Sequence, residues 1–370
     1  MLKSFSVTNY KCFKDTITLN FKTEHNYNFN SNIIYNGIVT KTMVVGPNGS
    51  GKTNLGFALF DIVRVLTDYT FNEHQNDYPS FLNAGSSEEY ATFVYEFINK
   101  GSLIRYEYRK TNPDRIIYES LEVDGVTIFV FSPDYNDYEE LKRYAKDLVV
   151  DDRNRDIAFL RYVARNSIQQ NDSPIRFIMD FVSRMLYFKS DNTGNSYIGF
   201  SNVREQVIQR LIADNTVEDF QSFLKKYGKM DVELKVVQDA DGKSDVYQMF
   251  GNKMIRFDNN ASSGTKMLLL LFYWSRFFEN VSLLYMDEFD AFYHFDLSER
   301  IMRMIIDIDG MQTVFTSHNT LLMSNDLLRP DCYWIVDDSH RLAPIPDRTH
   351  RELRQGHSLE RLYRNEEFNE

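Results

Sequence analysis

The 370-residue sequence has only two cysteines, Cys12 and Cys332, and their wide separation does not match the spacing of a metal-binding pair. No run approaches roughly 18 uninterrupted apolar residues, the length that a membrane-spanning helix needs. The N-terminus also lacks the charged and then apolar layout of a signal peptide. These absences argue against a disulfide scaffold, a zinc site and a membrane partner, and we expect a cytoplasmic protein.

Basic charge is scarce as well. Asp and Glu together number 53 against 42 Lys and Arg, so the formal net charge is −11. This balance disfavours a generally basic nucleic-acid-binding surface, but it leaves a local basic patch open. Hydrophobic residues make up 43% of the chain, which at this length is enough for a full α/β core and one inserted subdomain.

A complete phosphate-binding loop stands at residues 46–53, after the apolar segment 42–45 and before an amphipathic stretch that predicts a helix over 54–66. Glycines let backbone N–H groups close around phosphates, Lys52 supplies a positive charge to the β and γ oxygens, and Thr53 offers a hydroxyl to Mg²⁺. The helix also directs its positive end at the anion. The sequence therefore predicts a nucleoside triphosphate site formed by Gly46, Pro47, Asn48, Gly49, Ser50, Gly51, Lys52 and Thr53.

A second apolar segment, 281–288, ends in two acids, Asp287 and Glu288. A carboxylate at the end of a buried strand can complete the shell of a Mg²⁺ ion, and its neighbour can orient a water molecule toward the γ-phosphate. We therefore expect Thr53 and Asp287 to hold the metal and Glu288 to act in hydrolysis. Alone, such acids are common at strand ends.

Two further polar motifs stand at the ends of apolar segments. Ser263 and the amide of Gly264 precede the apolar segment 267–278, which predicts an anion site at a helix N-terminus. His318 ends the apolar segment 313–318. In isolation, the first is more often a helix cap and the second a structural histidine.

The remaining pattern predicts strands beside a helical insertion. The helical period begins near residue 138 and continues to about 187. Further helices are expected over 202–213 and 217–227. Strands are expected over 4–10, 17–21, 91–97, 103–109, 115–123, 126–131, 232–237 and 247–257.

The order and spacing of these motifs resemble the ABC-type P-loop ATPases, in the shortened Ser-Ser-Gly form of the SMC, RecF-like and OLD-like branch. The resemblance implies an α/β fold with ATP and Mg²⁺ as ligands, an N-terminal antiparallel β-meander, and a helical insertion between the phosphate loop and the signature motif. It also implies an ATP sandwich that forms a homodimer or higher oligomer, with Ser263 and Gly264 acting in the partner's site. His318 matches the switch histidine that reaches the γ-phosphate, and Asp290 matches the aspartate that joins the two sites. No glutamine matches the family's Q-loop.

We divide the chain into four parts on this basis: residues 1–135 and 231–345 form the two halves of the ATPase domain, 136–230 the helical insertion, and 346–370 a tail. Residues 351–364 resemble the tail of compact bacterial ATPases from abortive-infection and other anti-phage systems. The arginines of this segment would contact a partner or nucleic acid, or the segment is a solvated amphipathic tail, which is the commoner case. The same two interpretations, a contact surface or a solvated face, stay open for Arg153, Arg155, Arg161 and Arg165.

The leading hypothesis is an ATPase that senses or regulates in bacterial antiviral defence and controls a separately encoded toxic effector. The 52 residues after His318 are too few for a metal-dependent nuclease domain of the OLD type, so we expect another polypeptide to carry toxicity. The alternative is a RecF-like or SMC-like DNA repair ATPase that clamps DNA, for which the acidic charge is unfavourable. A transporter subunit and a non-hydrolysing scaffold fit the motifs less well.

Overall fold

The computed structural model describes residues 1–68, 80–150, 157–191, 194–199, 207–238, 242–291 and 293–369. Two seven-stranded sheets account for most of the strands in these ranges, together with one sheet of three strands and one of two. The expected helix over 202–213 is described only from residue 207 onward, and Arg153 and Arg155 lie outside the described residues. In the described ranges, no helix has the length and apolar character needed to cross a membrane.

The first large sheet is antiparallel and has the order β10-β9-β8-β7-β6-β1-β2. Its middle strands form the expected meander because alternating side chains are buried and tight turns connect neighbours. At the first turn, Lys100 and Gly101 both have positive φ, as a two-residue hairpin turn requires. The strands are β1 (Leu2–Thr8), β2 (Ile17–Asn20), β6 (Ala91–Asn99), β7 (Ser102–Asn112), β8 (Arg115–Val123), β9 (Val126–Phe131) and β10 (Asn136–Asp137).

The second large sheet is mostly parallel and has the order β12-β11-β16-β17-β5-β18-β19. Its five inner strands run parallel, and β12 and β19 are antiparallel edges. Continuous burial of β5, β16 and β17 is typical of strands covered on both faces. The strands are β5 (Lys41–Val45), β11 (Met185–Asp191), β12 (Gly194–Gly199), β16 (Leu283–Asp287), β17 (Gln312–Ser317), β18 (Tyr333–Val336) and β19 (Leu342–Pro344).

The segment 136–230 is not wholly helical, which corrects the expectation from the sequence. It contains α2 (Phe159–Asn166), α3 (Pro174–Val182), α4 (Val207–Ala213) and α5 (Val217–Phe223), but also β11 and β12. β11 pairs in parallel with β16 and so belongs to the central sheet. Residues 185–188 are apolar without alternation, and periodicity alone cannot separate such a short buried strand from a helix. The predicted domain boundaries stay predictions.

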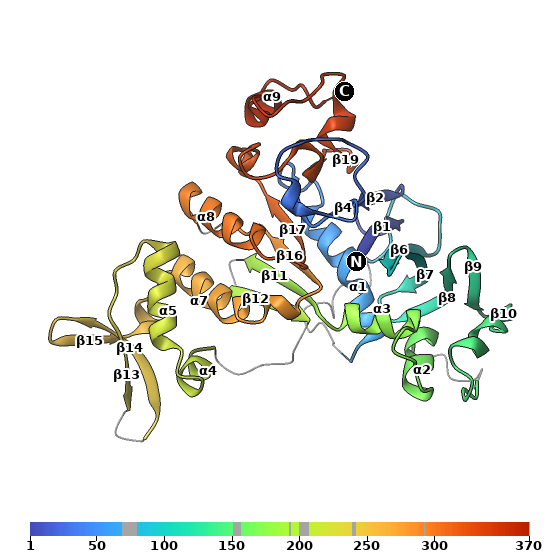
Figure 1. The fold of residues 1–370 in the computed structure, drawn as a ribbon, viewed down its shortest axis with the longest axis horizontal. Helices are drawn as coiled ribbons and strands as arrows, with labels where there is room; N and C mark the ends of the chain where they lie inside the picture. The colour runs from blue at the N-terminus through green and yellow to red at the C-terminus, as the bar shows by residue number, and fades with distance from the viewer. Residues whose placement is uncertain are drawn as a thin grey trace.

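The strand expected over 247–257 is wrong as a single element. It forms β14 (Ser244–Phe250), a turn and β15 (Lys253–Arg256), which pair with β13 (Leu234–Gln238) in a three-stranded sheet. Gly251 allows the turn because its φ is +61°. This small sheet lies at one end of the molecule beside α4 and α5 (Figure 1). Two further short strands, β3 (Ile34–Tyr35) and β4 (Ile38–Val39), form a separate hairpin.

Two hydrophobic clusters cover opposite faces of the central sheet. Along β16, Tyr285 joins one cluster while Leu284 and Met286 join the other. The first cluster includes α1 (Lys52–Leu66) and the antiparallel sheet, and the second includes α7 (Ser263–Ser275) and α8 (Phe295–Ile306). Helix α1 is therefore held between the central sheet and the antiparallel sheet (Figure 1).

The close approach of α1 to the central sheet depends on one glycine. A Cβ added at Gly56 would lie 2.5 Å from the ring of Tyr285 and 2.7 Å from that of Tyr187. Only glycine permits this packing without a shift of the rings. The contact fixes where α1 begins, and with it the position of the phosphate-binding loop.

The tail packs on the body of the protein. Leu359 in α9 (Leu359–Arg364) and Phe368 are buried, and Asn325 Nδ2 donates to the carbonyls of Arg354, Gln355 and His357. The apolar half of this segment is thus a docking face for its own chain. A short helix, α6 (Phe257–Asn260), completes the described α-helices.

Candidate active site

The phosphate-binding loop follows β5 and leads directly into α1. Gly46 is required by space, because an added Cβ would lie 2.3 Å from the carbonyl oxygen of Val336. Gly49 and Gly51 are required by conformation, since their φ angles are +80° and +111°. Pro47 and Asn48 form the exposed crest of the loop. The sequence-predicted loop therefore has the strand and helix context that phosphate binding needs.

Lys52 turns back over this loop. Its Nζ donates to the carbonyls of Gly46 at 2.8 Å and Pro47 at 2.9 Å, and it lies 3.2 Å from His318 Nδ1. Burial lowers the pKa of Lys52 to about 8, against the opposing influence of nearby acids. The ammonium is held by neutral carbonyl partners, so phosphate oxygens could replace them at the same place.

Asp287 lies at the end of β16 and accepts hydrogen bonds from three hydroxyl groups. Its Oδ2 accepts from Thr53 Oγ1 at 2.8 Å and from Tyr187 Oη at 3.1 Å, while its Oδ1 accepts from Thr316 Oγ1 at 2.8 Å. Burial raises the pKa of Asp287, and the hydrogen bonds from Thr316, Thr53 and Tyr187 oppose that shift. The two predicted metal ligands, Thr53 and Asp287, are thus in direct contact.

Glu288 and His318 meet beside this pair. Glu288 Oε1 lies 3.1 Å from His318 Nε2, and both side chains are about one third exposed, at 38% and 35%. Glu288 has a φ of +48°, and its backbone N–H donates to Thr316 Oγ1 at 2.8 Å. A left-handed backbone at a residue with a side chain costs energy and is typical of functional positions. The Glu288 carboxylate is therefore accessible to solvent, at the edge of the sheet where the parallel strands end.

Asp290 lies on the same edge. Its Oδ2 accepts from Ser317 Oγ at 2.7 Å, and burial raises the pKa of Asp290 despite that bond. The structure thus brings Asp290 to the end of β17, one residue before His318. Any role in a second subunit stays a prediction.

Ser263 and Gly264 lie at the first turn of α7. Ser262, one residue earlier than expected, is the cap: its Oγ accepts from the N–H of Thr265 at 3.2 Å. Ser263 is exposed, and among the described hydrogen bonds none joins Ser263 or Gly264 to the phosphate-binding loop. The structure therefore does not bring this motif to the site of its own chain.

Several site residues were missed from the sequence. Thr316 and Tyr187 bond Asp287, Tyr285 Oη donates to the carbonyl of Lys52 at 2.7 Å, and His340 Nδ1 lies 2.8 Å from the carbonyl oxygen of Ser50. Thr316 could have been found, because it is a hydroxyl residue near the end of the apolar segment that leads to His318. Tyr187 could not, since β11 was not predicted.

The residues present fit a phosphate and a divalent cation. The buried Oγ of Ser50 has no hydrogen-bond partner, although Ser50 stands in the centre of the loop. Buried polar atoms are normally bonded, so this hydroxyl fits a ligand with acceptor oxygens. The oxygens of Thr53 and Asp287 are the donor type that Mg²⁺ prefers.

Comparison with solved structures finds SMC head domains. The head bound to the C-winged helix domain of ScpA is 16% identical, with a TM-score of 0.44, and covers 86% of this chain and 89% of that chain. The head from Thermotoga maritima is 15% identical, with a TM-score of 0.44, and the match covers 93% of this chain and 98% of that chain. A third match is the Pyrococcus furiosus head with an extended coiled coil, bound to the C-terminal domain of ScpA. It is 12% identical, with a TM-score of 0.47, and the match covers 99% of this chain and 98% of that chain.

No curated protein matches the sequence. A family profile does match, over residues 41–324, and this family is described as "AAA domain, putative AbiEii toxin, Type IV TA system". The match begins at β5, runs through the phosphate-binding loop and continues past His318. Because the matched residues make up more than half of the chain, the protein belongs to this family of P-loop ATPases.

Proposed function

We propose that the protein binds ATP with Mg²⁺ and hydrolyses it to ADP and phosphate. The observation that carries this proposal is the meeting of Lys52, Thr53 and Asp287 with the Glu288–His318 pair, all at the carboxyl ends of β5, β16 and β17. In open α/β sheets, ligands bind at this edge. Family membership supports the nucleotide, and the geometry supports the chemistry.

Different residues of the site would bind the phosphates and the metal ion. The loop N–H groups and Lys52 would bind the phosphates, after Lys52 exchanges the carbonyls of Gly46 and Pro47 for phosphate oxygens. Thr53 and Asp287 would hold Mg²⁺, which when bound neutralises phosphate charge. Thr316 and Tyr187 fix the orientation of the Asp287 carboxylate.

Glu288 would orient the attacking water and accept its proton. Its exposed carboxylate can reach water, and the Nε2 of His318 can hold the same carboxylate in place. The Nδ1 of His318 lies 3.2 Å from Lys52 Nζ and 3.0 Å from the carbonyl oxygen of Gly46. His318 therefore connects the water-orienting acid with the phosphate-binding lysine.

We further propose an ATP-sandwich homodimer. Ser263 and the N–H of Gly264 lie at the N-terminus of α7, and no described hydrogen bond joins them to the phosphate-binding loop of their own chain. They would contact phosphate in the second subunit. Asp290, which accepts from Ser317 next to His318, would connect the two sites. In this proposal the protein regulates a toxic effector on another polypeptide in antiviral defence. The family description prints a putative toxin and a Type IV TA system, and it supports an association with a toxin system.

The test uses Glu288→Gln, with Glu299→Gln on α8 as a matched control that alters a partly exposed acid paired with Arg303. We expect phosphate release to fall about a hundredfold or more in Glu288→Gln while ATP binding persists. Light scattering should then show a dimer with ATP. Unchanged turnover would contradict the role of Glu288 in hydrolysis. A monomer with bound ATP would contradict the proposed ATP-sandwich dimer.

The regulatory part is tested by purifying Glu288→Gln together with the product of the adjacent gene. A complex that forms with ATP would support control of an effector. A dimer that ignores this product but retains duplex DNA in an ATP-dependent manner would instead favour DNA repair.

A further inference from the structure

The three-stranded sheet of β13, β14 and β15 has an edge strand, β15, that is exposed along its whole length. All four of its residues, Lys253 to Arg256, are exposed, and among the described strands only β14 pairs with it. Met254 and Ile255 are 50% and 45% exposed, on opposite faces of the strand. Phe250, which pairs with Lys253, is a further exposed apolar residue. An apolar edge strand that is open on both faces is typical of a place where a partner strand adds.

The backbone of β15 also has hydrogen-bonding groups that face away from its own sheet. Met249 donates its N–H to the carbonyl of Glu233, on the β13 side of β14, at 2.9 Å. Met254 is opposite Met249, so these two residues form a pair without mutual hydrogen bonds, and the N–H and carbonyl of Met254 point to the outer edge. The N–H of Arg256, two residues later, points the same way. In the described residues, no backbone hydrogen bond from outside the sheet reaches these groups.

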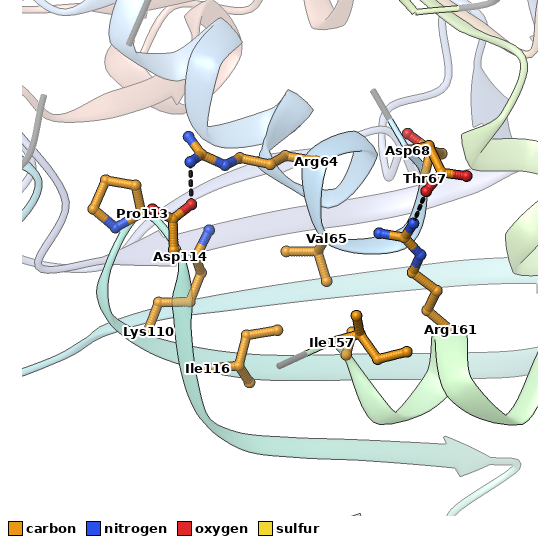
Figure 2. A pocket seen from close by; sticks show the side chains of 11 residues that line it. Arg64, Val65, Thr67, Asp68, Lys110, Pro113, Asp114, Ile116, Ile157 and Arg161 are labelled. Carbon is orange, nitrogen blue, oxygen red and sulfur yellow. Dashed lines mark hydrogen bonds and ion pairs between the residues drawn. The ribbon is translucent and has the colours of Figure 1, made fainter. Parts of the chain in front are cut away.

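The positive charge at the start of β15 has no acidic partner in the chain. Many surface cations of this protein do have one, as Figure 2 shows for Arg64 with Asp114 and Arg161 with Asp68. Lys253, in contrast, forms no ion pair with any described residue. Opposite charges on neighbouring strands attract when they face each other. An added strand with an acid opposite Lys253 would therefore complete this pair.

Arg256, at the other end of β15, already contacts one acid. Its Nη2 donates to Asp245 on β14, and its side chain is still 53% exposed. A guanidinium has more N–H donors than one carboxylate uses, so Arg256 can take a second acid. The strand that matches β15 therefore has two apolar residues, opposite Met254 and Ile255, between two acids.

We propose that β15 binds an extended segment of another polypeptide, which adds to the small sheet as a fourth strand and contains the order acid, apolar, apolar, acid. Main-chain hydrogen bonds to Met254 and Arg256 give this contact its geometry, and the four side chains give it selectivity. The sequence of this protein contains no such tetrad, so a second copy of the chain does not supply the matching segment. The occupant is therefore a different protein.

The strand lies next to the proposed dimer contact along the chain. Arg256 is followed directly by α6, and Ser263 in the first turn of α7 comes seven residues after Arg256. A partner that binds β15 more tightly in the ATP-bound protein must, by the same factor, raise the affinity for ATP. The identification of this partner with the toxic effector rests on the proposed function, whereas the binding of a strand to β15 does not.

The experiment measures the fluorescence anisotropy of three labelled peptides with the intact protein, without nucleotide. The first peptide has Glu-Val-Val-Glu at its centre, the second has Lys-Val-Val-Lys, and the third is the first with N-methylated valines. We expect saturable binding of the first peptide and at least about tenfold weaker binding of the other two, because one repels Lys253 and the other cannot complete the ladder. No saturable binding of the first peptide, or equal binding of another, would overturn the proposal.

Two substitutions at Met254 test the backbone contact. Met254→Pro removes the N–H that faces the outer edge and leaves the bonds to β14 in place, so the first peptide should bind at least about tenfold more weakly. Met254→Leu keeps both the N–H and an apolar side chain, and as the matched control it should bind like the unaltered protein. Equal affinity in both variants would contradict strand addition.

A charge reversal guards against loss of binding through misfolding. Lys253→Glu should weaken binding of the Glu-Val-Val-Glu peptide and strengthen binding of the Lys-Val-Val-Lys peptide, a gain that a misfolded protein would not show. Lys235→Glu changes an exposed lysine on β13, the far strand of the same sheet, and should keep the preference of the unaltered protein. The same shift in both variants would show attraction by overall charge and contradict the site.

The connection to the nucleotide site is measured separately, by repeating the first titration with a saturating non-hydrolysed ATP analogue. We expect the analogue to change the affinity for the Glu-Val-Val-Glu peptide. Failure of the analogue to bind would count against the proposed function and leave strand binding intact. Normal analogue binding with unchanged peptide affinity would overturn only the connection.

Discussion

Helix α1 carries two polar clusters of different character. At its N-terminus, Lys52 bonds only carbonyls and a histidine, and Ser50 Oγ has no partner. In its second half, Asp61 accepts two contacts from Lys110 Nζ and one from Tyr108 Oη at 2.9 Å. The Asp61 cluster thus pairs its two charges with each other, whereas the candidate site holds its lysine without a directly bonded acid and leaves one buried hydroxyl unpaired.

The cluster of Asp61, Lys110 and Tyr108 is also buried from solvent. Lys110 is 1% exposed and Asp61 9%, and the pair joins α1 to β7 of the antiparallel sheet. Burial lowers the pKa of Lys110, with Asp61 opposing the shift. Tyr108 Oη extends the network to Tyr95, whose hydroxyl reaches the carbonyl of Ala58. These bonds fix α1 against one sheet, so that its N-terminus can present the loop at the edge of the other.

The largest effect should come from breaking the satisfied cluster. Lys110→Met leaves the Asp61 carboxylate buried without its cation, which should lower the free energy of unfolding by about 3–5 kcal/mol. Urea denaturation measures this. The exposed Lys100–Asp172 pair offers a matched control, and Lys100→Met should leave stability nearly unchanged. Similar losses of unfolding free energy in both variants would contradict the expected difference between the buried and the exposed ion pair.

The ligand cluster should respond in the opposite manner. Lys52→Ala removes a buried charge that carboxylates do not directly bond, so stability should change little. Nucleotide affinity should fall roughly a hundredfold, because charge-assisted bonds to phosphate are lost. Fluorescence titration with a labelled ATP analogue measures the affinity. Normal affinity in Lys52→Ala, with folding confirmed by circular dichroism, would refute the assignment of the loop.

A smaller, pH-dependent effect is expected from Lys41, whose Nζ donates to the carbonyls of Ile308 at 2.9 Å and Met311 at 2.5 Å. Burial lowers the pKa of Lys41 to about 8, with Asp309 opposing the shift. Between this value and the ordinary 10.5, the unfolded chain binds more protons than the folded chain. Stability from this group therefore rises with pH across that window.

Comparing Lys41→Met with the unaltered protein isolates this contribution. The difference in unfolding free energy between about pH 7.5 and pH 10.5 should be at most about 3 kcal/mol larger in the unaltered protein. Urea denaturation at several pH values measures it. Parallel pH profiles for the two proteins would show that Lys41 keeps an ordinary pKa in the folded state.

Local signals explain which parts could be predicted. The meander was predicted because strands with one buried face alternate, and the strands ending at Asp287 and His318 because apolar runs stop at polar residues. The run 185–188 has neither signal, so β11 and the contact of Tyr187 with Asp287 were missed. The cap of α7 was placed one residue late, because Ser262 and Ser263 are equally good caps by sequence.

By itself, the sequence determined the phosphate-binding loop and the two acids after a buried strand, because each depends on consecutive residues. It also determined the family, because the order of the motifs along residues 41–324 is a property of the sequence. Only the tertiary structure decided which side chains meet. Thr53 and Asp287 are 234 positions apart, and Asp61 and Lys110 are 49 apart. Their contacts depend on strand order and on the packing of α1 at Gly56, which arise from burial across the whole core.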